Sequence, residues 1–229
     1  MTGALILYGS AARGDNNEDS DIDLLIVTSE SKISSVKFHG MEMQAYSETY
    51  LLSLARSGNL FAIHLAWEGR PCVDNINFFP RLKSNIKIKR SYAREIAHAS
   101  ALGFYLLDHS VTYSNNVLIN KRIAWCARTI MIAKLVERGV IAFSPQELLK
   151  HYPETYSSRL VGLRRSASER RSRFRDLKSF LEHHGTPFLK GGSEESYIKL
   201  FTKTKNDVAL STVKALRQPD LEQIRKDYT

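Results

Sequence analysis

Cysteine is scarce in this sequence, because the 229 residues include only two, Cys72 and Cys126. A framework of disulfide bonds is therefore excluded as the main source of stability, although a single disulfide remains open. We expect the other arrangement, two reduced and buried thiols in a cytoplasmic protein.

Long apolar runs are absent as well. No stretch reaches the roughly 18 uninterrupted apolar residues that a transmembrane helix needs, so no membrane span is predicted. The N-terminus, MTGALILYGS, has no basic n-region and no long apolar core, and it does not resemble a signal peptide. With 43% hydrophobic residues, the chain can bury a core in one large domain or two small ones.

Basic residues are few in the first third of the chain and abundant in the rest. Residues 1–75 hold 5 Lys and Arg against 10 Asp and Glu, whereas the remainder holds 28 against 14. The acidic part can hold cations, and the basic part can hold a polyanion. The net charge of +9 thus combines a negatively charged first third with a positively charged remainder, which suggests different functions for the two parts.

The first third has the pattern of a small mixed α/β unit. Strands are expected at Ala4–Tyr8, Asp21–Val27 and Val36–Tyr46, the last with Glu42 and Gln44 on one face and Met41, Met43 and Ala45 on the other. A helix should begin at the N-cap Ser47 and end near Gly58. A further helix and a short edge strand are expected within residues 59–74.

Helical spacing of apolar residues dominates the rest of the chain. It predicts helices at Ser91–Asp108, Asn115–Arg138 and Thr155–His184, and two more near the C-terminus. Another helix should begin at Ser144, with Pro145 at its first position and Glu147 completing a capping box. We therefore expect two domains, 1–85 and 86–229, of which the second is an all-α bundle.

The stretch LYGSAARGDNNEDSDIDLLIV places carboxylates inside an apolar strand. Asp21 and Asp23 are two residues apart, so on a strand both point to one face. Two like charges this close repel unless cations lie between them, and hard oxygen-seeking ions such as Mg²⁺ are the natural occupants. The preceding strand ends at Gly9-Ser10, where the glycine permits close approach of a phosphate and the serine can hydrogen-bond it.

Gly9-Ser10, ten intervening residues and then Asp21-Ile22-Asp23 resembles the signature of the DNA polymerase β-like nucleotidyltransferase superfamily. The longer run GSAARGDNNEDSDIDLLIV is similar to the minimal nucleotidyltransferases of prokaryotes, with Arg13-Gly14 and Ser20 in their usual places. Their relatives include aminoglycoside nucleotidyltransferases and antitoxins that adenylylate a partner toxin. The resemblance implies a polymerase β-like catalytic domain at residues 1–85.

The resemblance also implies a set of site residues. The superfamily takes a third carboxylate from a neighbouring strand, and Glu42 in GMEMQAYS is the match, with Glu in place of the commoner Asp. Two Mg²⁺ ions, or Mn²⁺, would be held by Asp21, Asp23 and Glu42. The triphosphate, expected to be that of ATP, would be bound by the residues of the glycine-serine segment and its flank: Gly9, Ser10, Arg13 and Ser20.

The function implied is transfer of a nucleoside monophosphate, AMP from ATP, to a hydroxyl of a protein, an RNA or a small molecule. A toxin–antitoxin or defence setting fits the minimal motif. Two alternatives stay open: a nucleotide-binding regulatory module with vestigial catalysis, and an RNA-binding protein that uses the basic C-terminal half. The base preference, the acceptor atom and the oligomeric state are left open, a homodimer being one arrangement.

The run RLVGLRRSASERRSRFRDLK is read as one arginine-rich helix. Either it is a solvated face with Glu169 and Asp176 as partial partners, or it is a surface for RNA, an acidic protein or nucleotide phosphates. The arginines placed on it are Arg159, Arg164, Arg165, Arg170, Arg171, Arg173 and Arg175.

Four further residues are weighed as functional candidates. His64 is expected to be a hydrogen-bonded structural histidine, and Glu68 either faces the cleft or ends a helix in solvent. The helical half is similar in outline to HEPN domains, whose ribonucleases have four to six residues between an Arg and a His. Arg94 and His98 have only three between them, so no ribonuclease is predicted.

Overall fold

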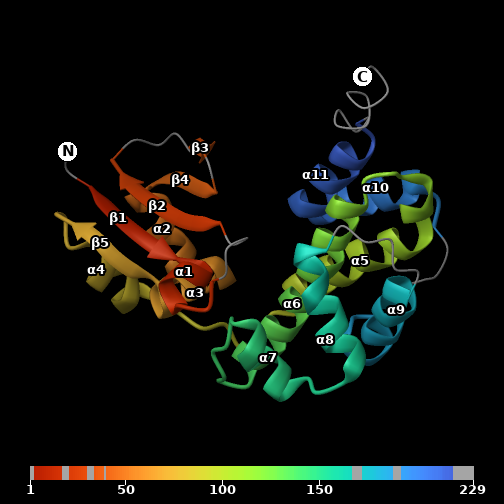
Figure 1. Ribbon diagram of the computed structural model, residues 1–229. Coiled ribbons are helices and arrows are strands. Elements are labelled where there is room, and N and C mark those ends of the chain that lie inside the picture. The colour runs from red at the N-terminus through yellow and green to blue at the C-terminus, as the bar shows by residue number, and fades with distance from the viewer. Residues whose placement is uncertain are drawn as a thin grey trace. The chain divides into compact units, whose positions relative to one another are not determined.

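The computed structural model describes residues 3–16, 21–29, 34–38, 40–166, 172–187 and 192–218. The chain forms two compact units, Met1–Arg90 and Ser91–Thr229. Figure 1 labels the elements of both.

The first unit is built on a five-stranded sheet with the strand order β3-β4-β2-β1-β5 (Figure 1). β2 and β4 pair in parallel, and the other neighbouring strands pair antiparallel, so the predicted mixed sheet is confirmed. The strands span Ala4–Tyr8 (β1), Ile22–Thr28 (β2), Ser34–Phe38 (β3), Met41–Ser47 (β4) and Arg70–Asp74 (β5).

The prediction of a single strand over Val36–Tyr46 is wrong, because this segment belongs to a hairpin of β3 and β4. Gly40 lies between the two strands with a φ of 76°. Glycine reaches this left-handed conformation without strain, and the chain turns back so that Val36 pairs with Met43. Apolar residues alternate on both sides of the turn, so periodicity alone did not reveal it.

Four helices complete the first unit in the described residues: α1 (Gly9–Arg13), α2 (Glu48–Arg56), α3 (Leu60–Glu68) and α4 (Phe78–Asn85). α2 begins as predicted, since the Ser47 hydroxyl accepts a hydrogen bond from the Tyr50 amide. α4 was not predicted. The Asp74 carboxylate accepts hydrogen bonds from the amides of Phe78 and Phe79 at 2.7 and 2.8 Å, so an upstream side chain satisfies this helix start.

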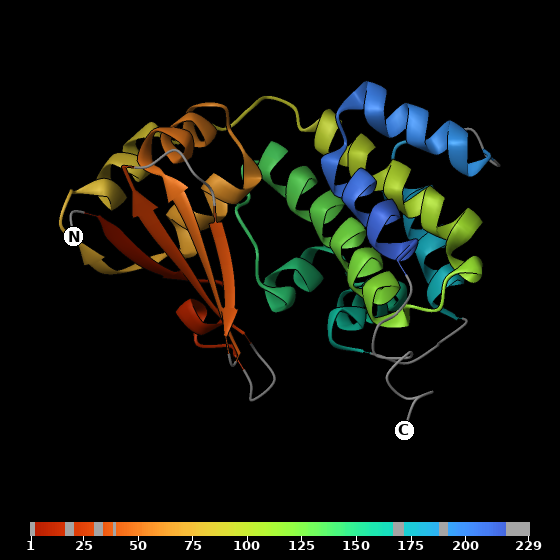
Figure 2. The ribbon, with the colours of Figure 1, turned by 90° about the horizontal axis from the view of Figure 1, so that it is seen from above.

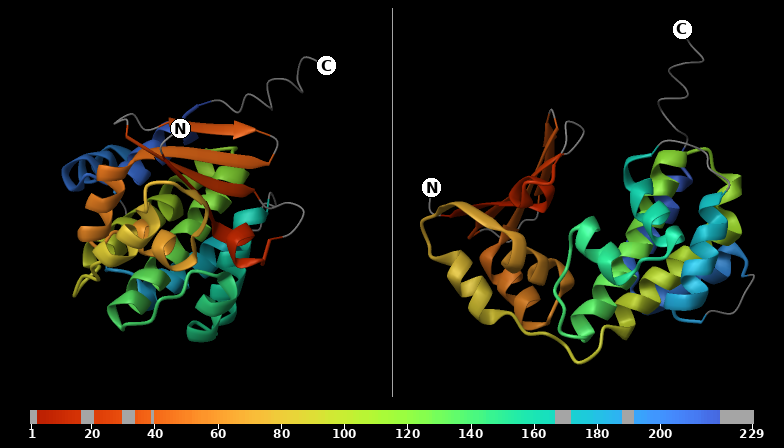
Figure 3. Two further views of the ribbon diagram at one scale, coloured as in Figure 1. Left: turned by 90° about the vertical axis from the view of Figure 1, so that its left-hand side faces the viewer. Right: turned by 60° about the horizontal axis from the view of Figure 1, so that its bottom comes forward.

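Alternation along the strands separates two faces of the sheet. α2, α3 and α4 cover one face, which the right-hand view of Figure 3 shows with the sheet nearly edge-on. Ile6, Leu25 and Leu51 are fully buried there, and burying each such side chain stabilises the fold by about 1.5–3 kcal/mol. The opposite face is apolar but partly exposed, with Ile22 at 41% and Val73 at 45%.

The second unit is helical throughout the part that the structure describes. α5 and α6 pack side by side (Figure 2), and Ser144 caps α7 as predicted by accepting a hydrogen bond from the Glu147 amide. No helix among the described residues has the length and apolar character that crossing a membrane requires. The helices are α5 (Ala93–His109), α6 (Asn116–Glu137), α7 (Pro145–His151), α8 (Thr155–Gly162), α9 (Ser172–His184), α10 (Glu194–Thr204) and α11 (Asp207–Leu216), with short 3-10 helices η1 (Ser110–Thr112) and η2 (Leu163–Arg165).

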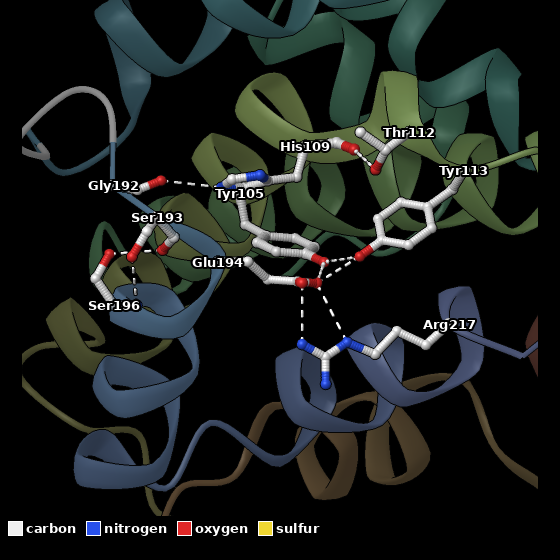
Figure 4. A network of polar contacts seen from close by, with 9 residues as sticks. All are labelled: Tyr105, His109, Thr112, Tyr113, Gly192, Ser193, Glu194, Ser196 and Arg217. Atoms are coloured by element: carbon white, nitrogen blue, oxygen red, sulfur yellow. Dashed lines mark hydrogen bonds and ion pairs between the residues drawn. The ribbon is translucent and has the colours of Figure 1, made fainter.

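A polar network around Glu194 joins α5, α10 and α11 (Figure 4). The Glu194 Oε1 atom accepts hydrogen bonds from the hydroxyls of Tyr105, at 2.8 Å, and Tyr113. Its Oε2 atom accepts a hydrogen bond from Arg217 Nη2 at 2.9 Å. One carboxylate at the start of α10 therefore contacts α5, the segment after η1 and Arg217, the residue that follows α11.

The prediction of one helix over Thr155–His184 is also wrong. The segment contains α8, η2 and α9, and Arg159 of α8 makes two 2.7 Å hydrogen bonds to Asp176 of α9. On a single straight helix these positions, 17 residues apart, would be separated by about 25 Å. α8 and α9 instead pack against each other.

The arginines of this segment therefore do not share one face. Arg173 is buried and donates to the side-chain oxygens of Asn120 and Asn116 at 2.7 and 2.6 Å. Arg164 and Arg175 are exposed. Arg170 and Arg171, and the predicted partner Glu169, lie outside the described residues.

The two cysteines differ in their surroundings. Cys126 is buried, as predicted, and burial raises the pKa of its thiol. Cys72, expected to be buried, is exposed because it lies on the edge strand β5. Both are free thiols.

Candidate active site

The sheet register places Asp23 between Tyr8 and Glu42. Tyr8 of β1 pairs with Asp23 of β2, and Asp23 in turn pairs with Glu42 of the parallel strand β4. Paired residues on adjacent strands project to the same face, and such strands lie about 4.8 Å apart. The two carboxylates thus come from neighbouring strands and share the face toward which the Tyr8 side chain points.

Tyr8 lies next to the two carboxylates, and their charges affect the pKa of its hydroxyl. Burial raises the pKa of its phenol, and the negative charges of Asp23 and Glu42 raise it further. The Tyr8 hydroxyl therefore stays protonated at neutral pH. Because both carboxylates influence the same phenol, the end of the sheet next to α1 is a region of concentrated negative potential.

Gly9 brings the backbone against the Asp23 carboxylate. Its φ is 72°, and a Cβ at this position would lie 2.5 Å from Asp23 Oδ2. That distance is far inside van der Waals contact, so any other residue would have to adopt a strained backbone conformation and displace the Asp23 carboxylate. The predicted glycine-serine turn therefore lies beside the predicted carboxylate Asp23, with no room for a side chain between them.

Ser10 follows in the first turn of α1. Its carbonyl accepts hydrogen bonds from the amides of Gly14 and Asp15 at 2.9 and 3.2 Å, which closes the short helix. The Ser10 residue itself is partly exposed. It is thus accessible beside the carboxylates, where the sequence places phosphate binding.

Asp21 is exposed and lies one residue before β2. The amide of the next residue, Ile22, donates to the Gly40 carbonyl at 2.8 Å, which fixes the backbone where β2 begins. Ser20, the other predicted nucleotide-binding residue here, lies outside the described residues.

The described part of the chain holds no group of three His, Cys, Asp or Glu side chains placed to bind a metal ion. The structure thus joins Asp23 with Glu42 through the sheet register and leaves Asp21 at the entrance to the strand. In kind, the donors fit a hard divalent cation, because all three are carboxylates and such cations prefer oxygen.

A hydrogen-bonded chain along β4 orients Glu42. Gln44 Nε2 donates to Glu42 Oε1 at 3.2 Å, and the Tyr46 hydroxyl donates to Gln44 Oε1 at 3.0 Å. The two bonds fix which end of the Gln44 amide faces Glu42. This role was not predicted from the sequence, although the alternation of polar side chains at positions 42, 44 and 46 was its signal.

Arg13 faces two carboxylates rather than an open site. Its Nη1 atom lies 2.5 Å from Glu68 Oε2, and its Nε and Nη2 atoms lie 3.2 and 3.1 Å from the carboxylate oxygens of Asp15. His64 Nε2 lies 2.8 Å from the same Glu68 oxygen. His64 is thus hydrogen-bonded, as expected.

The interpretation of Glu68 as a solvated helix end is wrong, since its side chain is only 7% exposed. Burial alone would raise the pKa of Glu68, but the hydrogen bonds from His64 and Arg13 outweigh it and lower the pKa. Burial alone would lower the pKa of Arg13, and the bonds to Glu68 and Asp15 raise it instead. Both partners of this ion pair are therefore charged at neutral pH.

Comparison with known proteins bears on the same segment. Residues 2–60 match the family model of the nucleotidyltransferase domain, which confirms the resemblance to nucleotidyltransferases for the part of the chain that carries the glycine-serine turn and the carboxylates. No curated protein matches the chain.

Among solved structures, the chain is similar to a nucleotidyltransferase-like protein from Exiguobacterium sibiricum 255-15. The two share 12% sequence identity over 96% of this chain and 76% of the other, with a TM-score of 0.34. This likeness is too low to support any inference about the site.

Proposed function

We propose that the nucleotidyltransferase domain at the N-terminus transfers a nucleoside monophosphate, AMP from ATP, to a hydroxyl of an acceptor. One observation carries the proposal: the sheet register sets Asp23 beside Glu42, and Gly9 brings the predicted phosphate-binding turn against Asp23. A phosphate-binding turn beside paired carboxylates is what transfer from a metal-bound triphosphate requires.

Each residue has a distinct task in this proposal. Asp21, Asp23 and Glu42 would hold divalent cations, Mg²⁺ or Mn²⁺. Bound Mg²⁺ would lower the pKa of the acceptor hydroxyl and offset the charge of the triphosphate. The Ser10 hydroxyl and amide would donate hydrogen bonds to phosphate oxygens, and Gly9 would let the phosphates approach the backbone closely.

The reaction exchanges one phosphorus–oxygen bond for another. The acceptor oxygen forms a bond to the α-phosphorus, and the bond from that phosphorus to its bridging oxygen breaks. Pyrophosphate leaves with the electron pair, and the acceptor proton passes to solvent. The residues of the chain contribute mainly by position, since orientation alone can supply about 7–11 kcal/mol of the barrier.

The acceptor is proposed to be a protein or an RNA that the basic second unit engages, with a small molecule as the third class. The second unit holds 23 Lys and Arg against 14 Asp and Glu, and this excess of positive charge supports an acidic or polyanionic acceptor. The buried Arg173 takes no part in such a surface, whereas the exposed Arg164 and Arg175 can.

The experiment is label transfer. The protein is incubated with Mg²⁺ and each α-labelled nucleoside triphosphate, alone and with cell lysate, and label is followed into protein, RNA and small molecules. We expect transfer from ATP. The double variant Asp21→Ala with Asp23→Ala should lose at least about a hundredfold of it, on the order of 3 kcal/mol of transition-state stabilisation.

Glu195→Ala is the matched control, because this carboxylate is exposed on α10 in the second unit and should leave transfer unchanged. If the double variant transfers label as well as the wild type, the assigned site is wrong.

A second candidate function is a nucleotide-binding module without catalysis. It is favoured by one observation: within the described residues, Asp21 does not join Asp23 and Glu42 in a metal-binding group of three. Retained binding of ATP, together with an absence of transfer to every acceptor class, supports this candidate. Transfer of label to any acceptor would exclude this second candidate function.

A further inference from the structure

We propose that helix α3 holds both ends of α1, the short helix that begins with the phosphate-binding turn, through His64 and Glu68. We call this arrangement the clamp. In this proposal Arg13 is a positioning residue that holds the turn, and it does not bind the triphosphate. The inference rests on the proposed function in assuming that the Gly9-Ser10 turn receives the nucleotide.

α1 is too short to be stable by itself. It has five residues, whereas isolated helices shorter than about 12–15 residues are marginal in water. Its position must therefore come from contacts with other elements. Ala12 is 1% exposed and packs into the core. One small side chain in the middle of the helix does not fix the positions of its two ends.

The first end is held through Tyr8, the residue immediately before Gly9. The Tyr8 ring meets the His64 ring edge-on, with centroids 6.1 Å apart and an interplanar angle of 80°. It meets Phe61 of the same helix in the same way, at 5.8 Å. Such edge contacts favour a defined ring orientation, so α3 sets where β1 ends and the turn begins.

The second end is held through Arg13, the last residue of α1. Its guanidinium bonds to Glu68, which lies four residues after His64 on α3 and therefore on the same face. The same oxygen, Glu68 Oε2, contacts both Arg13 and His64. The two ends of the turn are thus connected to each other through a single helix turn of α3.

The charges around Arg13 argue against a role as triphosphate ligand. Glu68 and Asp15 present two negative charges to its one positive charge, so the local balance repels a polyanion. To reach a phosphate, the guanidinium would leave Glu68, a carboxylate that is only 7% exposed. Glu68 would keep its contact with His64 but lose its arginine partner, and separating a largely buried ion pair is unfavourable. The contacts of Arg13 therefore fit a positioning role better than a role in binding the triphosphate.

The position of the turn matters because Gly9 lies beside Asp23. A shift of α1 therefore moves the phosphate-binding backbone relative to Asp23 and Glu42. A displaced turn would bind the triphosphate less tightly, and a loss of binding that is equal in the ground state and the transition state appears as a higher KM.

Glu68→Gln separates the two roles of Arg13 by the sign of its effect. If Arg13 bound the triphosphate and Glu68 competed for it, the substitution would free the guanidinium and lower the KM for ATP. If Glu68 positions the turn, the KM rises. We expect a rise of about tenfold with kcat changed less than about threefold, since the reacting groups remain present.

Arg13→Gln should also raise KM, and the effects of the two substitutions should be less than additive in the double variant, because both remove the Arg13–Glu68 ion pair. Glu48→Gln is the matched control: it removes another carboxylate–arginine pair of the first unit, Glu48 with Arg81, that does not involve α1. Its KM should equal that of the wild type. A lowered KM in Glu68→Gln, or additive effects in the double variant, overturns the proposal.

A second readout does not depend on activity. The amides of Gly14 and Asp15 both donate to the Ser10 carbonyl, so their hydrogen exchange reports opening of α1. Glu68→Gln should speed this exchange about tenfold, and Glu48→Gln should not. If no transfer is ever detected, this measurement still tests the clamp. If exchange is unchanged while transfer is normal, the clamp fails and the proposed function stands.

His64→Leu serves if Glu68→Gln does not fold. It removes the ring contact with Tyr8 and the bond to Glu68 but leaves Arg13 and Glu68 paired. Exchange at Gly14 should then be faster than in the wild type. Exchange equal to that of the wild type contradicts the role of His64.

Discussion

At the scale of single residues, Gly9 sets the distance between the phosphate-binding turn and the Asp23 carboxylate. Three independent constraints meet at this position: a φ of 72°, an Asp23 carboxylate oxygen only 2.5 Å from where a Cβ would lie, and a neighbouring Tyr8 that is fixed by ring contacts. Any side chain at position 9 must therefore displace either the turn or Asp23.

Gly9→Ala should lose transfer activity by more than about tenfold. The positive φ costs on the order of 1–2 kcal/mol for alanine, and the added Cβ pushes on the Asp23 carboxylate in addition. Gly139→Ala is the control for strain alone, because Gly139 has a φ of 78° and no atom within 4 Å of the added Cβ. Thermal unfolding and steady-state kinetics compare them. Equal kinetic effects of the two substitutions would show that contact with Asp23 is unimportant.

At the scale of elements, the arginine-rich segment shows how packing reassigns a charge pattern. Arg159 pairs with Asp176 across two helices, and Arg173 is buried against α6, where it donates to Asn116 and Asn120. Asn120 Nδ2 in turn donates to the Ser166 carbonyl at 2.7 Å. Part of a run that suggests a polyanion-binding face is therefore internal structure that joins α6, α9 and the end of η2.

Arg173→Met should destabilise the second unit by about 3 kcal/mol, because it removes hydrogen bonds from a charged donor and leaves buried acceptors unsatisfied. Arg175→Met, two residues further along α9 and exposed, should change stability by less than about 0.5 kcal/mol. Denaturant unfolding measures both. A solvated helix face predicts the same small effect for the two arginines, so equal losses contradict the buried role.

At the scale of the whole molecule, each unit contains a carboxylate whose pKa is lowered by its partners. In the first unit this is Glu68, as described above. In the second unit, the hydrogen bond from Arg217 lowers the pKa of Glu194 from its ordinary value of 4.5 to about 2, with the hydroxyls of Tyr113 and Tyr105 adding to the effect. Both groups favour the folded state most when they are ionised.

Acid should therefore weaken both units. The stabilisation from Glu194 is complete above the unfolded pKa near 4.5 and is lost as the pH falls toward about 2. The stability difference between the wild type and Glu194→Gln should have its full value above the unfolded pKa near 4.5 and shrink steadily below it. Glu195→Gln, at an exposed neighbouring position, should show no such trend. Thermal unfolding across a pH series measures both differences. A constant difference for Glu194→Gln would exclude the linkage.

Local signals predicted much of the first unit. β1 and the start of α2 lie where alternation and the Ser47 cap place them, because strand period and capping depend on neighbouring residues. The turn at Gly40 and helix α4 were missed. The turn at Gly40 lies within a continuous alternation of polar and apolar residues. Helix α4 is capped by Asp74, a side chain from the preceding strand rather than from the residue just before the helix.

The sequence by itself determined the glycine-serine turn, the spacing of the carboxylates and the helical character of the second unit, since each is written in residues close together along the chain. Only the tertiary structure decided that Glu42 stands beside Asp23 and that Arg13 meets Glu68, 55 residues away. Strand order and register are set by the burial of whole faces, and an ion pair between α1 and α3 forms only after both helices have packed. Contacts of this kind have no local signature.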